Sequence, residues 1–167
     1  MRKLNILKAI VDFVWIMTWI ALPLIVIVSI VMLFDKEALE VPIQINGSDL
    51  DLSNAYDKYA LPLGIVYIGF LLFSLYFFRK LLTNFQKRII FENENADYLN
   101  KIGNIIMIEA LIYALATIII HFLNNKITIT LGYGPFLYLL GLGLFFKVLA
   151  EVFKMGKSLK EENDLMI

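Results

Sequence analysis

Ionisable side chains within apolar stretches are the residues of this chain that could do chemistry. Asp12, Glu109, Lys147 and Glu151 each lie in or beside a run of hydrophobic residues about as long as a membrane span. Carboxylates and an ammonium group in such surroundings either neutralise one another or mark a path for protons or cations. Lys147 and Glu151 are four residues apart, so they lie on the same face of a helix and can form an ion pair.

The depth of these charges indicates that they belong together. At a rise of about 1.5 Å per residue, Glu109 lies about 10 Å inside its segment, on the side where Lys147 lies about 10 Å and Glu151 about 5 Å deep. Asp12 lies near the start of the first segment, one turn after Lys8. We therefore predict an intramembrane polar cluster of these four residues that faces the interior of a helix bundle. Ion pairs that fix helix register, a proton or cation relay, and a switch that a partner disturbs all fit this cluster.

Four long apolar segments must position these side chains. They cover about residues 9–34, 59–79, 102–124 and 134–154, and each is close to the roughly 20 residues that a helix needs to cross a hydrocarbon core of about 30 Å. Hydrophobic residues make up 60% of the chain, which exceeds the need of a soluble domain. Because lipid offers the backbone no hydrogen-bond partner, these segments should be helical. We predict an all-α membrane protein, a four-transmembrane-helix bundle that forms a single domain over residues 1–167.

Small residues and basic residues add detail to this bundle. Ala110 with Ala114, and Ala60 with Gly64, have the spacing that lets transmembrane helices approach closely. Of the 15 Lys and Arg residues, 11 lie before the first segment, between the second and third, or after the fourth. Because basic loops stay in the cytoplasm, we predict a multi-pass protein with both termini and the middle connection on the cytoplasmic side.

The two external connections show strand patterns. VPIQINGSDLDL, residues 41–52, alternates apolar and polar residues around an Asn-Gly pair, which is the strongest short signal for a hairpin turn. KITITL, residues 126–131, alternates again and would supply a third strand. We therefore predict a small extracytoplasmic β-hairpin.

The connection between the second and third segments is too long for a simple turn. The apolar stripe of one helical face continues here, so we expect the second helix to extend beyond the span. The residues of this stripe are Leu81, Leu82, Phe85 and Ile89. FENEN, residues 91–95, has the residue types that begin a helix, which predicts the start of the third. The basic residues of this connection suit an anionic membrane surface, either as ordinary anchors or as a dedicated lipid or protein site.

The composition argues against most enzyme classes. The chain has no cysteine and a single histidine, His121, so it has no disulfide and no multi-histidine metal site. It also has no Ser/His/Asp set and no phosphate-binding loop. We expect a protein that is not an enzyme and that needs no cofactor or metal.

Two segments carry a family resemblance. FENENADYLNKIG, residues 91–103, and LAEVFKMGKSLKEENDLMI, residues 149–167, resemble the two signatures of the DUF2975 family of bacterial integral membrane proteins. Met166 departs from the second signature, where threonine or serine is usual. The matching residues are Phe91, Asn95, Leu99, Ile102, Gly103, Ala150, Val152, Phe153, Gly156, Leu159, Glu162, Asn163, Asp164, Leu165 and Ile167.

The resemblance implies an inner-membrane protein whose biochemical activity is unassigned. It also implies a gene that lies beside one for a small Cro/Xre-type helix-turn-helix regulator. Our leading interpretation is a regulatory or scaffolding protein that presents its cytoplasmic connection and C-terminal tail to such a regulator, without binding nucleic acid itself. The alternative is a small transporter or channel subunit that uses the intramembrane Glu/Lys cluster. The sequence does not indicate an oligomeric state.

The partner-binding candidates lie in the two signature segments and beside them. We expect the acidic tail to fold back onto the basic end of the second helix, which would create one composite surface on the inner side of the membrane. The candidates are Lys87, Arg88, Phe91, Asn95, Glu161, Glu162, Asn163 and Asp164.

Overall fold

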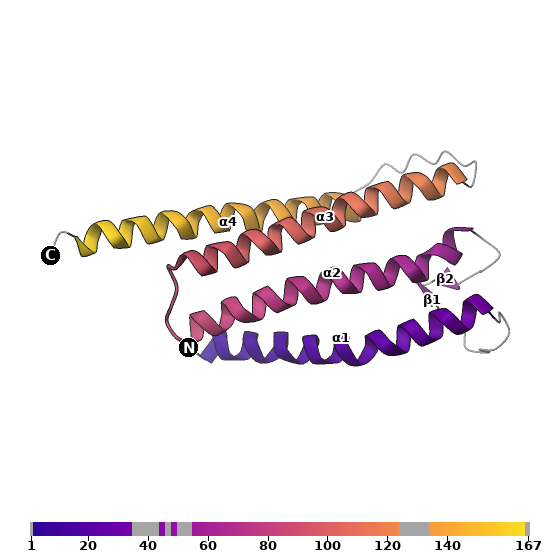
Figure 1. The fold of residues 1–167 in the computed structure, drawn as a ribbon, viewed down its shortest axis with the longest axis horizontal. Helices are drawn as coiled ribbons and strands as arrows, with labels where there is room; N and C mark the ends of the chain where they lie inside the picture. Colours follow the sequence, from indigo (N-terminus) through magenta and orange to yellow (C-terminus); the bar gives the residue numbers. More distant parts are fainter. Residues whose placement is uncertain (1, 35–43, 46–47, 50–54, 124–133, 166–167) are drawn as a thin grey trace.

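The computed structural model describes residues 2–34, 44–45, 48–49, 55–123 and 134–165. Four long helices run side by side along the length of the molecule (Figure 1). Each includes a stretch that is long and apolar enough to cross a membrane. The predicted four-helix membrane fold is therefore confirmed. The helices are α1 (Arg2–Phe34), α2 (Ala55–Gln86), α3 (Asn93–Leu123) and α4 (Pro135–Asp164).

The helices are longer than the predicted spans, and the extra turns lie at one end of the molecule. α2 continues beyond residue 79 to Gln86, and α3 begins at Asn93, well before residue 102. The FENEN segment therefore predicted the start of α3 correctly. The apolar stripe correctly predicted that α2 continues beyond its span, but α2 ends at Gln86, three residues before Ile89, because the chain turns at Arg88. α4 extends to Asp164, and its end reaches beyond the other three helices (Figure 1).

The predicted β-hairpin is not supported as a structural element. The described residues include β1 (Gln44–Ile45) and β2 (Ser48–Asp49), which pair antiparallel, with Gln44 opposite Asp49. Two strands of two residues each are too short to establish the element expected over residues 41–52. The rest of that segment and the predicted third strand at residues 126–131 lie outside the described residues.

The helices pack in chain order, so the bundle is open along one side. α1 lies against α2, α2 against α3, and α3 against α4, whereas α1 approaches neither α3 nor α4 within the described helices. Leu81, Tyr98, Leu99 and Ala150 form the buried core, which joins α2, α3 and α4. Six partly buried hydrophobic side chains pack around it: Phe77, Phe78, Phe85, Phe146, Leu149 and Phe153.

Glycine permits the closest approach between two helices. A Cβ atom added to Gly103 of α3 would lie 2.8 Å from the carbonyl oxygen of Gly143 on α4, which is closer than real side chains come. Ala110, one residue of the predicted small-residue pair with Ala114, is fully buried. Gly64 makes no close contact, because nothing lies within 4 Å of the position of its missing Cβ. The two helix backbones therefore cross at Gly103 and Gly143.

Candidate functional site

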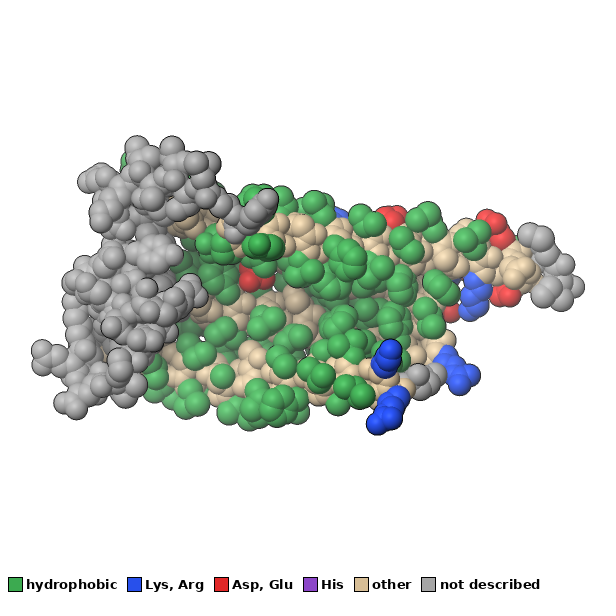
Figure 2. Space-filling model, turned by 180° about the vertical axis from the view of Figure 1, so that it is seen from behind, with side chains coloured by type: hydrophobic (Ala, Val, Ile, Leu, Met, Phe, Trp, Pro, Cys, Tyr) green, Lys and Arg blue, Asp and Glu red, His purple; other side chains and the backbone are tan. Residues whose placement is uncertain are grey.

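Charged side chains gather at one end of the molecule. Figure 1 places the N-terminus, the α2–α3 connection and the C-terminus at this end, which we call the charged end (residues 2–12, 79–104 and 147–164). In Figure 2, hydrophobic side chains cover the middle of the visible face, while most blue and red side chains lie toward the charged end. The three segments that the distribution of Lys and Arg assigned to a common side thus share one end of the bundle.

Asp12 joins α1 to α2. Its carboxylate accepts a hydrogen bond from Lys8 Nζ at 2.9 Å and another from Arg79 Nε. The guanidinium of Arg79 also lies 4.1 Å from the centre of the Trp15 ring. Lys8 is the partner expected from the one-turn spacing, whereas sequence reasoning did not assign Arg79 to Asp12.

The predicted four-residue polar cluster is not assembled. Lys147 Nζ donates to Asn104 Oδ1 at 2.9 Å, and Glu151 pairs with Lys154 at 3.3 Å. Among the described residues, no ion pair includes Glu109.

The reason for this correction is the direction that long basic side chains take in a membrane. Asn104 lies five residues nearer than Glu109 to the charged end, or about 7 Å along the helix. A lysine extends toward the polar end of its helix rather than deeper into the hydrocarbon, so Lys147 meets Asn104. Asp12 cannot join this cluster either, because within the described helices no Cα atom of α1 lies within 8 Å of α3 or α4, the helices that carry the other three residues.

Asn95 closes the connection between α2 and α3. Its side chain is fully buried, and its amide donates to the carbonyl oxygens of Ile89 at 2.8 Å and Ile90 at 2.7 Å. Its own oxygen accepts a hydrogen bond from Asn84 Nδ2 at 2.8 Å. The two donated bonds satisfy backbone carbonyls of the connection, which lie beyond the end of α2 and belong to no helix. Asn95 is therefore a structural residue, and its burial removes it from the predicted partner contacts.

The end of α2 is a Schellman motif in which the usual glycine is replaced by arginine. The Ile89 amide donates to the Asn84 carbonyl and the Arg88 amide to the Phe85 carbonyl, both at 3.0 Å. Arg88 has φ of 63°, in the left-handed region that glycine adopts without cost. The motif turns the chain sharply, and it leaves the side chains of Lys87 and Arg88 exposed.

Phe91 and Gly156 connect the two signature segments. A Cβ on Gly156 would lie 2.5 Å from the Phe91 ring, so only glycine leaves room for this phenylalanine. The Phe91 ring also lies 5.8 Å from that of Phe153, which stacks on Phe85 at 5.6 Å. The segments that carry the family resemblance are thus packed against each other at the charged end, although Phe91 remains 41% exposed.

The tail does not fold back as predicted. Among the described residues, no ion pair joins Glu161, Glu162 or Asp164 to Lys87 or Arg88. α4 instead continues as a helix in which Lys157 pairs with Glu161 at 3.3 Å. The ion pair that does join the tail to the connection has the opposite arrangement of charges: Lys160 of the tail pairs with Glu92 of the connection at 3.8 Å. A continuous helix cannot bend its acids onto α2. Glu161, Glu162, Asn163 and Asp164 are therefore exposed on a projecting helix.

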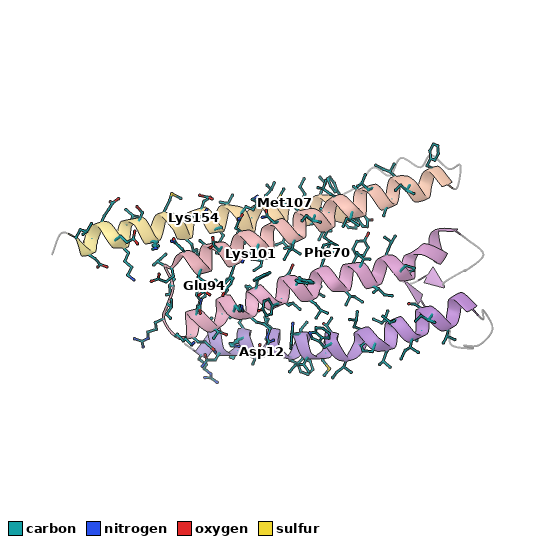
Figure 3. All side chains as sticks on the ribbon, viewed as in Figure 1. Asp12, Phe70, Glu94, Lys101, Met107 and Lys154 are labelled. Carbon is teal, nitrogen blue, oxygen red and sulfur yellow. The ribbon has the colours of Figure 1, made fainter. Side chains whose placement is uncertain are left out.

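An unexpected hollow lies at the charged end between α1, α2 and α3. It has a volume of about 440 Å³, and its lining includes Lys8, Arg79 and Lys80 together with Glu94. Figure 3 shows Asp12 on α1 and Glu94 at the start of α3, on either side of α2. Sequence reasoning treated these basic residues as anchors. The signal that could have found the hollow is the spacing of Tyr76, Arg79, Lys80 and Thr83, which puts them on one helical face.

Four long apolar helices with their charges gathered at one end define a multi-pass helical membrane protein. A family model described as "Protein of unknown function (DUF2975)" matches residues 7–167, which is nearly the whole chain. The chain therefore belongs to the DUF2975 family. Neither a curated protein nor a solved structure matches it significantly.

Proposed function

We propose that this protein is a non-enzymatic regulatory or scaffolding protein of the bacterial inner membrane that holds a cytoplasmic partner through the end of α4. The observation that carries the proposal is that α4 projects beyond its neighbours (Figure 1) and leaves an apolar stripe uncovered near its end. Val152, Met155 and Leu159 are 47%, 58% and 65% exposed. Their spacing of three and four residues puts them on one face of the helix.

The residues around this stripe argue for a position outside the hydrocarbon. Charged side chains occupy the rest of the projecting turns, and a helix segment that carries so many charges is not stable in lipid. An apolar stripe at helical spacing on a charged helix is the pattern by which helices dock into a partner's groove. The charged residues of these turns are Lys154, Lys157, Lys160, Glu161, Glu162 and Asp164.

The packing at the charged end supports the proposal that α4 is held in place for binding a partner. Phe91 lies against Gly156, and Lys160 pairs with Glu92, so the α2–α3 connection supports the first projecting turns of α4. A helix held in this way binds without first paying the entropy of becoming ordered. The excess of Lys and Arg at this end supports a cytoplasmic location. The partner that the family resemblance implies is a small helix-turn-helix regulator of the Cro/Xre type.

The transporter alternative is weaker on the same observations. It requires Glu109, Lys147 and Glu151 to form one polar site within the membrane. Lys147 instead bonds to Asn104, and Glu151 pairs with Lys154. An intramembrane relay needs ionisable groups that pass a charge between them. We therefore do not propose transport.

The proposal is tested by recovering partners from native membranes. We expect a tagged protein truncated after Gly156, which keeps the contact with Phe91, to recover the cytosolic regulator at least tenfold less well than the full chain. The double variant Met155→Glu/Leu159→Glu should have the same effect, because it places two carboxylates on the stripe. Ser158→Glu adds a carboxylate to the same helix beside the stripe and serves as the control. Equal recovery of cytosolic proteins by all four forms would refute the proposal.

A further inference from the structure

Three of the eight residues that line the hollow between α1, α2 and α3 are cations. Lys8 comes from α1, Arg79 and Lys80 come from α2, and Glu94 comes from α3. Tyr76 and Tyr98 also line it, and Lys80 Nζ lies 4.7 Å and 5.6 Å from the centres of their rings. Both tyrosine rings therefore hold the ammonium group at the hollow.

The charges of this hollow do not balance. Asp12 accepts hydrogen bonds from both Lys8 and Arg79, and one carboxylate cannot neutralise two cations. Glu94 bonds to the Tyr98 hydroxyl and to Asn84. Among the described residues, no carboxylate lies within ion-pair distance of Lys80. Three cations against two carboxylates leave one positive charge, which is the charge that a single phosphodiester would neutralise.

From this arrangement we propose that the hollow binds the phosphodiester headgroup of an anionic phospholipid, with Lys80 as its principal phosphate ligand. The phosphate group lies against Lys80, and Arg79 and Lys8 contribute the rest of the positive field. Glu94 lies on the far wall, where its carboxylate accepts a hydrogen bond from a hydroxyl of the headgroup. A zwitterionic phospholipid, whose own charges cancel, leaves the excess positive charge of the hollow in place.

The position of the hollow favours a lipid over a free ion as the source of this phosphate. Within the described helices, no Cα atom of α1 lies within 8 Å of one in α3 or α4, so these helices do not pack closely along the seam beside α2. A headgroup in the hollow can therefore extend its acyl chains along the apolar sides of the helices. On α1, Trp15 lies one to two turns farther from the charged end than Asp12 and Lys8, and the Arg79 guanidinium lies over its ring. Tryptophan at such a position is typical of the level of the lipid headgroups. The proposal goes beyond partner binding by α4 and does not depend on it.

The test measures lipid bound to the full-length protein by native mass spectrometry in detergent. Phosphatidylglycerol is the anionic probe, phosphatidylcholine the zwitterionic one, and sodium phosphate the free ion. A basic residue near an anionic headgroup contributes about fivefold in affinity, so Lys80→Gln should weaken phosphatidylglycerol binding about fivefold. Lys3→Gln removes the same charge from an exposed position of α1 at the same end of the molecule, outside the hollow, and should bind as the wild type does.

The remaining outcomes separate the alternatives. Lys80→Arg should bind phosphatidylglycerol like the wild type, and circular dichroism should give all three variants the wild-type helix content. Equal weakening by Lys80→Gln and Lys3→Gln would overturn the proposal, since it would show a general charge effect. Binding of phosphatidylcholine as strong as that of phosphatidylglycerol would overturn it too. Displacement of the lipid by an equimolar amount of sodium phosphate would overturn the assignment to a lipid headgroup.

Discussion

The contact between α3 and α4 differs in kind from the contact between α1 and α2. α3 and α4 meet at backbone level, where Gly103 lies against Gly143, and Ala110 and Ala150 are buried along the two helices. α1 is instead joined to α2 at the charged end by polar bonds, chiefly between Asp12 and Arg79. Close apolar packing resists any change of volume, whereas partly exposed polar bonds contribute little each. The two pairs should therefore respond very differently to substitution.

The largest effect is expected where the backbones of α3 and α4 meet. Gly143→Leu forces a side chain against the carbonyl oxygen of Gly103, only 3.0 Å from the added Cβ, and against Met107. Overpacking typically costs about 1–3 kcal/mol, and contact with backbone places this variant at about 3 kcal/mol or more. Thermal unfolding followed by circular dichroism in detergent measures the loss.

The control for this variant lies two residues away on the same helix. Gly141 has nothing within 4 Å of its missing Cβ. Gly141→Leu should therefore leave the melting temperature close to that of the wild type. Equal loss in the two variants would show that the crossing at Gly143 is not the closest contact of the helices.

A smaller effect is expected at the polar contact of α1. Asp12→Asn and Arg79→Gln each remove the ion pair, whose side chains are about 30% exposed. A double-mutant cycle should give a coupling free energy of about 1 kcal/mol, at the upper end for partly exposed pairs. Hydrogen exchange should rise in the first turns of α1 while α3 and α4 keep the protection of the wild type. A coupling near zero would show that α1 is held by other contacts.

The smallest effect, and the one stabilising change, is expected at the connection between the two helix pairs. Arg88 adopts φ of 63° at the end of α2. Arg88→Gly should raise the free energy of unfolding by about 0.5–1 kcal/mol, because glycine adopts this conformation without strain. Arg88→Ala keeps the strain and loses the same charge, so it should not stabilise. A gain in both variants would assign the effect to charge instead of backbone conformation.

The sequence predicted the parts of this fold that depend on long, repeated patterns. Four apolar segments predicted four helices, and the stripe through Leu81 and Phe85 predicted that α2 continues beyond its span. Such patterns did not predict which side chains on different helices bond to one another. The depth of Lys147 and Glu109 is readable from helix rise, but the bond of Lys147 to Asn104 depends on which way its side chain extends and how closely α3 and α4 approach.

The signature residues illustrate the same limit. Their resemblance to a family pattern marked Phe91, Asn95 and Gly156 as related, yet did not show whether they face a partner or one another. The answer required the left-handed turn at Arg88, which brings the connection back over α4. A non-glycine residue in that conformation is not predicted by local propensity.

The crossing at Gly103 and Gly143 also determines how α4 can move relative to α3. Carbonyl oxygens and neighbouring side chains leave no space there for one helix to slide past the other by a residue. A change in the relative position of α3 and α4 must therefore be a tilt about this contact, and the contacts of Phe91 with Gly156 and of Glu92 with Lys160 oppose it. The part of α4 from Gly143 to Asp164 is about 30 Å long, so a tilt of about 5° displaces the C-terminal end of the helix by about 3 Å. A small rearrangement near the membrane centre would thus be magnified at the far end of the helix.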